Sequence, residues 1–156
     1  MIKYIKLRRM TDDEYIIWKE WSSKNYIKSL MEARQCSEND ARALADKEAK
    51  EFSLPNDNLF VAENNDGNPV GVIWYVIQDF NHIFILDFVV YDKYRRMGYG
   101  SAILTELERK VKSERFSIIV LHVFEYNKAA IELYEKCGYK IVQNTGSGGM
   151  YMEKQI

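Results

Sequence analysis

Hydrophobic residues recur along this chain with two different spacings, which divide it into expected helices and expected strands. Apolar positions three or four residues apart predict helices, and they cover 11–34, 37–52, a stretch that ends near 112, and 127–137. Shorter runs rich in β-branched and aromatic residues predict strands, at 2–7, 59–63, 70–78, 83–91, 117–123, 139–142 and 150–153. This order of elements predicts a mixed α/β sheet with helices on its faces.

Polar residues at the expected helix ends support these boundaries. Thr11, followed three residues later by Glu14, is the sequence pattern of a capping box. Ser37 and Asn127 stand at N-cap positions, and Gly138 suits the left-handed position just after a helix end. We therefore expect helices to begin after the first three caps and one helix to end before the glycine.

The composition fits one domain that spans residues 1–156. A chain of this length, with 47% hydrophobic and 29% charged residues, can bury about 70% of the surface that its unfolded form exposes. Its formal net charge of -1 argues against a surface devoted entirely to nucleic acid. Any site for an anion should therefore be a local cluster of basic residues.

Nothing in the sequence predicts membrane insertion, secretion or a metal site. The longest apolar run, 70–77, is far shorter than the roughly 20 residues that cross a bilayer. Basic residues interrupt the N-terminal apolar positions, so no secretory signal is expected. Cys36 and Cys137 are the two cysteines, a number that points to reduced thiols in the cytoplasm. His82 and His122 are isolated from each other and from the cysteines.

The segment Arg95-Arg96-Met97-Gly98-Tyr99-Gly100 joins an expected strand to an expected helix and is suited to binding phosphate. The first backbone N–H groups of a helix have no intrahelical acceptor, and the helix dipole adds roughly half a positive charge there. Gly98 and Gly100 would let ligand oxygens approach the backbone. Arg95 and Arg96 supply charge and forked donors. For this segment alone, a solvated turn is the competing interpretation.

A dinucleotide-binding loop is a second alternative for the same segment. That fingerprint requires a third glycine three residues after the second, and an acidic residue about 20 positions further on. Position 103 is Ile instead. The match to this fingerprint therefore fails.

A second segment, 127–134, predicts a helix face that could bind a ligand. Asn127 and Tyr134 are two helical turns apart, so they fall on nearly one face with Ala130 between them. The phenol of Tyr134, with an ordinary pKa of about 10, could protonate a departing thiolate. A phosphate anchor followed by such a donor suggests coenzyme A. The competing interpretations are a core aromatic for Tyr134 and a simple N-cap for Asn127.

Together, these two segments resemble the GNAT superfamily of acyl-CoA-dependent N-acyltransferases. Residues 95–100 match its R/Q-x-x-G-x-G/A pyrophosphate loop, and residues 127–139 match its N-x-x-A-x-x-L-Y-E-x-x-G-F/Y segment. The resemblance extends to Asp87-Phe88-Val89-Val90 and to Leu121-His122-Val123. Counting the order of elements as well, it covers most of the chain.

The resemblance implies a GNAT fold in which a bulged strand splays from the parallel strand after it, and the acyl-CoA arm lies in the opening. It implies acetyl-CoA as the cofactor. The residues that would bind it belong to the strand end, the loop and the later helix: Phe88, Val89, Val90, Arg95, Arg96, Met97, Gly98, Tyr99, Gly100, Ser101, Asn127, Ala130 and Tyr134. The N–H of Val90 or a neighbour would stabilise the oxyanion, and Tyr134 would protonate the leaving sulfur.

Direct acetyl transfer to an amine, which the resemblance also implies, needs a base to remove a proton from the ammonium form. His122 is one candidate, because some relatives carry at its position a glutamate proposed as the base. A histidine with a pKa near 6.5 can serve that role. Asp87 is the second candidate. Either residue could instead be a hydrogen-bonded residue of the sheet.

The same resemblance leaves the acceptor open, as a small-molecule, peptide or protein amine. The region 11–52 is expected to shape its pocket, with Trp18 and Trp21 in the core or in the pocket wall. Members of the family often form homodimers. Two rival functions are a non-catalytic acyl-CoA-binding or regulatory module and a nucleic-acid-binding module that uses the paired arginines. The near-neutral net charge disfavours the latter.

Overall fold

A computed structural model describes residues 3–51 and 55–156 of the chain. The predicted strand start at 2 and the predicted helix end at 52 lie outside these residues. Within them, seven strands form one sheet in the order β1-β2-β3-β4-β5-β7-β6. Their bounds are Lys6–Arg9 (β1), Leu59–Glu63 (β2), Pro69–Ile77 (β3), His82–Val90 (β4), Ile118–Phe124 (β5), Lys140–Asn144 (β6) and Gly149–Gln155 (β7). β4 and β5 run parallel, and every other neighbouring pair is antiparallel, which confirms the predicted mixed sheet.

Four α-helices and one 3₁₀ turn complete the described part of the chain. They are Asp12–Arg34 (α1), Glu38–Glu51 (α2), Tyr99–Ser113 (α3), Lys128–Lys136 (α4) and the 3₁₀ turn Asp92–Tyr94 (η1). The predicted capping box is present, since Thr11 Oγ1 accepts from the N–H of Glu14 and the Glu14 carboxylate accepts from the N–H of Thr11. Ser37 caps α2 by accepting from the N–H of Asp40 at 3.1 Å. Gly138 has the expected positive φ, of 96°.

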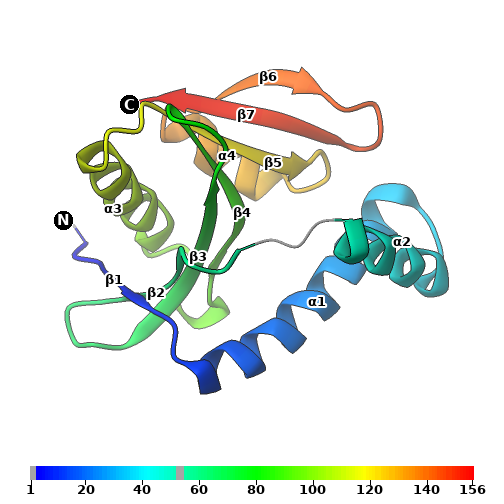
Figure 1. Cartoon of the computed structure of the whole chain (residues 1–156), viewed down its shortest axis with the longest axis horizontal. Coiled ribbons are helices and arrows are strands. Elements are labelled where there is room, and N and C mark those ends of the chain that lie inside the picture. Colours follow the sequence, from blue (N-terminus) through cyan, green and yellow to red (C-terminus); the bar gives the residue numbers. More distant parts are fainter. Residues whose placement is uncertain (1–2, 52–54) are drawn as a thin grey trace.

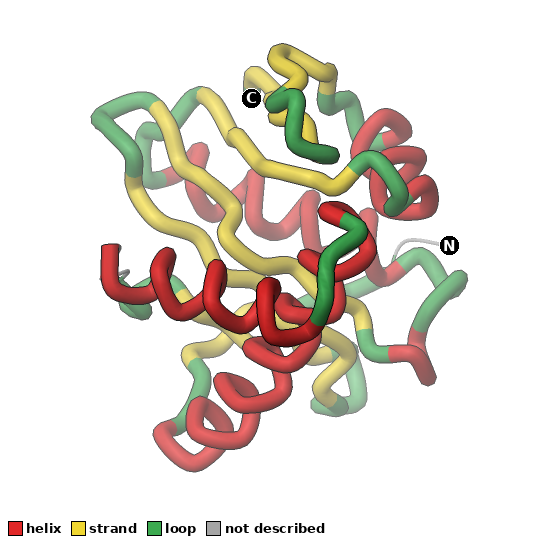
Figure 2. Tube along the Cα trace, turned by 90° about the vertical axis from the view of Figure 1, so that its right-hand side faces the viewer, coloured by secondary structure: helices red, strands yellow, loops and turns green. Residues whose placement is uncertain are grey.

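α3 and α4 lie on one face of the sheet and α1 lies over the other, with α2 packed beside α1 (Figures 1 and 2). α3 and α4 pack on the face that holds the larger core, in which Ile103, Leu104 and Leu107 are fully buried. α1 lies over the opposite face, where Trp18 packs with Leu59 and Val72. The main core therefore lies between the sheet and α3, and α1 makes a smaller contact.

A bulge in β4 interrupts the sheet near its centre. Trp74 of β3 pairs with Asp87 and Tyr75 pairs with Ile85, so Leu86 is an extra residue on β4. Pairing between β4 and β5 begins at His82 and ends at Ile85, opposite Leu121. Beyond that point the two parallel strands separate, as the resemblance led us to expect. The last five residues of β4 therefore have no pairing partner on β5, and we call the region between the two unpaired strand ends the opening.

Candidate functional site

The loop between η1 and α3 presents backbone N–H groups that lack acceptors. Arg96 and Gly98 adopt left-handed conformations, with φ of 59° and 85°, and α3 begins at the next residue with no side-chain cap. The first N–H of α3 with a backbone acceptor is that of Ala102, which donates to Gly98 O at 3.2 Å. In the part of the chain described here, the N–H groups of residues 99–101 therefore have no backbone acceptor, which favours an anion at this helix end.

Glycine is favoured at the two positions of the loop for different structural reasons. A side chain on Gly98 would meet only Lys3 Cγ, at 3.7 Å, but the left-handed backbone there disfavours other residues. A side chain on Gly100 would place its Cβ 2.9 Å from Leu133 Cδ2 of α4. Any side chain at this position would displace the end of Leu133, so the second glycine favours close packing of α3 on α4, whether or not a ligand also approaches it.

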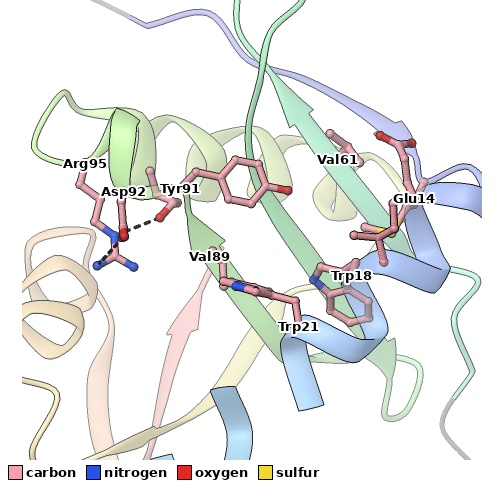
Figure 3. A pocket seen from close by; sticks show the side chains of 11 residues that line it. Glu14, Trp18, Trp21, Val61, Val89, Tyr91, Asp92 and Arg95 are labelled. Atoms are coloured by element: carbon pink, nitrogen blue, oxygen red, sulfur yellow. Dashed lines mark hydrogen bonds and ion pairs between the residues drawn. The ribbon is translucent and has the colours of Figure 1, made fainter. Parts of the chain in front are cut away.

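The side chains of the loop point in different directions. The guanidinium of Arg95 is held by the end of β4, where its Nε donates to Val90 O at 3.0 Å, and it forms an ion pair with Asp92 (Figure 3). Arg96 and Met97 are exposed. The ring of Tyr99 is buried beside Tyr94, so only its backbone can face an anion. Arg95 is exposed as well, but its contacts with Val90 and Asp92 hold it in place, so Arg96 is the arginine better suited to turn toward a pyrophosphate.

The end of β4 directs a backbone N–H into the opening between β4 and β5. The N–H of Tyr91 donates to Val70 O of β3 at 2.9 Å. Because N–H groups alternate sides along a strand, the N–H of Val90 points away from β3. β5 supplies no partner there, since its pairing with β4 ends at Ile85. This N–H is positioned to donate to a carbonyl that enters the opening.

Tyr134 of α4 borders the same opening from the core side. It is 7% exposed, and its ring lies 6.2 Å from that of Phe88 on β4. Burial raises the pKa of its phenol above the usual value near 10, and the charges of Asp87 and Cys137 act in the same direction. The hydroxyl therefore keeps its proton at neutral pH and can act as a donor.

Asp87 reaches the α1 face of the sheet because of the bulge. The extra Leu86 places Asp87 opposite Trp74, a residue of the α1-side cluster. Its Oδ2 accepts a hydrogen bond of 2.9 Å from Ser22 Oγ, in the middle of α1. Burial raises the pKa of the Asp87 carboxyl, whereas the hydrogen bonds from Ser22 and from the N–H of Phe88 oppose that rise.

His122 lies on β5 at the other border of the opening. Its neighbours Leu121 and Val123 face the main core, so the imidazole faces the α1 side of the sheet. The ring packs between Phe124 and Tyr151, with centroid distances of 5.1 and 5.4 Å. Burial lowers the pKa of His122, with Arg34 contributing and Glu48 opposing. The imidazole is therefore neutral near pH 7.

Asn127 caps α4, as the sequence predicts. Its Oδ1 accepts from the N–H of Ala130 at 3.3 Å. Asn127 is exposed and Ala130 is half-buried, so both are accessible from the side where the N-termini of α3 and α4 lie. Their contact with a cofactor stays a prediction.

A cleft of about 420 Å³ lies between α1 and the end of β4 (Figure 3), and we call it the α1 cleft. Its apolar wall consists of Met10, Ile17, Trp18, Trp21, Val61 and Val89. Glu14, Tyr91, Asp92 and Arg95 stand at its polar edge, and Val90 also lines it. The expectation that Trp18 and Trp21 form core or pocket wall agrees with this arrangement. Sequence reasoning missed Tyr91 and Ser22, because no local spacing connects them to the motifs.

Two further classes of site receive no support from the residues that the structure describes. No three His, Cys, Asp or Glu side chains gather there in a way that could hold a metal ion. Nor is any helix among them long and apolar enough to cross a membrane.

Comparison with known proteins decides the family. Residues 15–139 match the model of the acetyltransferase (GNAT) family. The chain belongs to the GNAT family. Membership identifies it as an acetyl-CoA-dependent N-acetyltransferase, in agreement with the loop at the start of α3 and the bulged β4.

Two relatives from Bacillus subtilis (strain 168) are similar over almost their full length. The uncharacterized N-acetyltransferase YycN is 27% identical over 144 residues, covering 87% of this chain and 92% of the relative. The uncharacterized N-acetyltransferase YdgE is 25% identical over 142 residues, covering 85% and 90%. Neither name specifies an acceptor.

Solved acetyltransferase structures share the fold. The crystal structure of YycN superposes with a TM-score of 0.82, at 25% identity, over 91% of this chain and 96% of that one. A structure from Bacillus anthracis, determined in complex with acetyl coenzyme A, has a TM-score of 0.57 at 24% identity and covers 69% and 67% of the two chains. The likeness to the second structure concerns the fold alone.

Proposed function

We propose that this acetyltransferase moves an acetyl group directly from acetyl-CoA to an amine while both substrates are bound. The observation that supports this most is the convergence of three groups at the opening between β4 and β5. These are the free N–H of Val90, the buried phenol of Tyr134 and the carboxylate of Asp87. Each group corresponds to one requirement of acyl transfer, namely oxyanion stabilisation, proton donation and proton removal.

The cofactor would be anchored at the N-terminus of α3. The unpaired N–H groups of residues 99–101 and the guanidinium of Arg96 would bind the pyrophosphate, with Arg95, Met97 and Gly98 shaping the loop. The pantetheine arm would then pass beside Asn127 and Ala130 into the opening, along Phe88, Val89 and Val90. Such an arrangement holds the thioester in line with the amine, and positioning of this kind supplies much of the rate.

The reaction itself would follow in a balanced sequence. The amine nitrogen attacks the thioester carbon, a C–N bond forms, and the oxyanion accepts a hydrogen bond from the N–H of Val90. The C–S bond then breaks, and Tyr134 gives its proton to the departing thiolate. The base takes one proton from the ammonium form before attack and passes it to solvent. After attack the nitrogen is positively charged, and it loses a second proton as the C–S bond breaks. This proton returns, directly or through solvent, to the phenolate of Tyr134.

Asp87 is the base that the geometry favours over His122. It lies on the same strand as the oxyanion donor Val90, and Ser22 fixes its Oδ2. The raised pKa of Asp87, which comes from burial, brings a carboxylate closer to the strength that a base needs near neutral pH. His122 is neutral and is the second candidate, although its ring is packed between Phe124 and Tyr151.

Thiol release from acetyl-CoA in the presence of a panel of amines tests this proposal. We expect wild-type protein to release CoA with at least one amine, and Tyr134→Phe to release it much more slowly while binding acetyl-CoA equally well. Acetyl-CoA binding with no release for any amine would instead support the rival function, a non-catalytic acyl-CoA-binding module. We also infer a cytoplasmic location, which the two free cysteines support.

A further inference from the structure

The α1 cleft borders the proposed reaction centre. Val89 and Val90 line it, and Val90 carries the N–H assigned to the oxyanion. An amine bound in the cleft would therefore have its body against α1 and its nitrogen near the end of β4. This inference rests on the proposed function, since it concerns which amine that function uses.

The two carboxylates at the edge of the cleft are each paired with an arginine. Glu14 receives two hydrogen bonds from Arg8, at 2.7 and 2.9 Å, and this contact lowers the pKa of Glu14 to about 2. Asp92 forms an ion pair of 3.3 Å with Arg95. Both carboxylates of the lining are thus compensated by arginines, and a second ammonium group on the acceptor would find no uncompensated partner among these lining residues.

The remainder of the wall offers apolar surface that a ligand could bury. Ile17 is 72% exposed and Trp21 is 42% exposed, whereas Trp18 and Val61 form the buried floor. Apolar surface of this kind favours an apolar body over a cationic one, because a buried ammonium group would lose its water without gaining a partner.

We propose that the α1 cleft selects primary amines whose remaining body is large, apolar and uncharged, such as an amino acid amide or a peptide N-terminus with a bulky first side chain. Polyamines, which carry further ammonium groups, are poor ligands for this surface. The volume of about 420 Å³ is within the range of pockets that bind small molecules.

Matched acceptors test the selectivity. Phenylalaninamide and glycinamide carry the same amine and carbonyl and differ only in the apolar side chain, whereas spermidine carries additional charge. We expect kcat/KM for phenylalaninamide to exceed both others by about 10-fold or more, because filling an apolar pocket discriminates by at least that factor. Equal or higher kcat/KM with glycinamide or spermidine would overturn the inference and leave acetyl transfer itself intact.

Neighbouring isoleucines provide the matched variants. Ile16 and Ile17 are both exposed on α1, at 68% and 72%, but only Ile17 lines the cleft. Ile17→Ala should raise the KM for phenylalaninamide several-fold and Trp21→Ala about 10-fold, while Ile16→Ala should leave it unchanged. The KM for acetyl-CoA should stay constant in all three variants.

Two outcomes would contradict the assignment in distinct ways. Equal effects of Ile16→Ala and Ile17→Ala would show that the cleft does not hold the acceptor. Sedimentation could instead show that wild type dimerises and Trp21→Ala does not, with acceptor preference unaltered, which would identify the surface as a contact between two copies. Failure of every amine to release CoA would reject the proposed function itself.

Discussion

The two helices that flank the reaction centre, α3 and α1, are anchored very differently. α3 has five buried residues in 15, and its N-terminus forms the cofactor loop. α1 has only two buried residues, Trp18 and Leu30, in 23. The cofactor is common to the family, and the helix proposed to bind it belongs to the core. The proposed acceptor cleft is lined by a helix with few buried residues, whose surface residues can change at little cost in stability.

This difference in burial predicts that substitutions are tolerated less well on the cofactor side of the site than on the acceptor side. On the cofactor side, a residue often has a backbone or packing role as well, as Gly98 and Gly100 do. On the acceptor side, residues such as Ile17 and Trp21 are exposed, so replacing them should change the stability of the fold little. Variants on the first side should therefore abolish a function that all substrates share, and variants on the second should change preference.

The largest effect is expected from Gly98→Glu, which puts a side chain and a negative charge into the anion site. Binding of acetyl-CoA should be lost in calorimetry, because the carboxylate repels the pyrophosphate where the N–H groups converge. Gly67→Glu is the matched control, since Gly67 also has a positive φ, of 80°, and open space around it. Both variants should lose about 1–2 kcal/mol of stability from the strained backbone, and only the first should lose the cofactor. Intact affinity in Gly98→Glu would remove the basis for this site.

Tyr134→Phe comes next in size. Removal of a general acid should lower kcat by a factor of about 100 or more, with acetyl-CoA affinity close to wild type in calorimetry. Tyr139→Phe is the control, because that hydroxyl is buried and has no partner among the described residues; its loss should leave the rate unchanged. A Tyr134→Phe enzyme that is as fast as wild type would show that the thiolate takes its proton elsewhere.

A smaller effect, on pH dependence, is expected from Ser22→Ala. Ser22 hydrogen-bonds the ionised carboxylate, so its removal favours the protonated form and raises the pKa of Asp87 further. A base works when deprotonated, so the acidic limb of the kcat/KM profile should move to higher pH, with the rate recovering above it. Ser22→Thr, which keeps the hydroxyl, should restore the wild-type profile. An unshifted limb in Ser22→Ala, together with loss of the limb in His122→Gln, would assign the base to His122.

The smallest effect is expected from Thr11→Ala, which removes the N-cap of α1. Loss of the cap should lower the free energy of unfolding by about 1 kcal/mol, as measured by urea denaturation, with acetyl-CoA affinity unchanged. A change in cofactor affinity would mean that α1 and α3 are coupled more closely than their burial indicates.

Sequence reasoning succeeded where a local pattern has a local cause. The caps Thr11, Ser37 and Asn127 each accept the hydrogen bond expected of them, and the left-handed Gly98 and Gly138 are where the chain turns. The loop proposed to bind the cofactor could be predicted because it depends on backbone geometry. Glycines and helix-capping residues in the sequence indicate that geometry. The first strand was predicted less well: residues 3–5 are not part of it, and it spans Lys6–Arg9, because its register places Lys6 opposite Glu63, the last residue of β2.

The acceptor half depends on contacts between distant positions, and those leave no periodic signal. Ile16, Ile17, Trp18 and Trp21 form one apolar set in the sequence, yet only Trp18 is buried. The hydrogen bond between Ser22 and Asp87 spans 65 positions. The bulge at Leu86 carries no glycine or proline to mark it, so only the family resemblance predicted it. Residue spacing alone cannot distinguish a helix face that packs in the core from one that lines a cleft.

The short pairing between β4 and β5 also has a mechanical consequence. Only four residue pairs, from His82 to Ile85, link the four strands β1 to β4 with the three strands β5 to β7. The sheet thus consists of two parts joined by a short stretch of parallel pairing, and the acyl chain would be inserted where that pairing is missing. The amides of a bound pantetheine arm could then hydrogen-bond to both strands, so the bound cofactor would itself connect the two parts of the sheet.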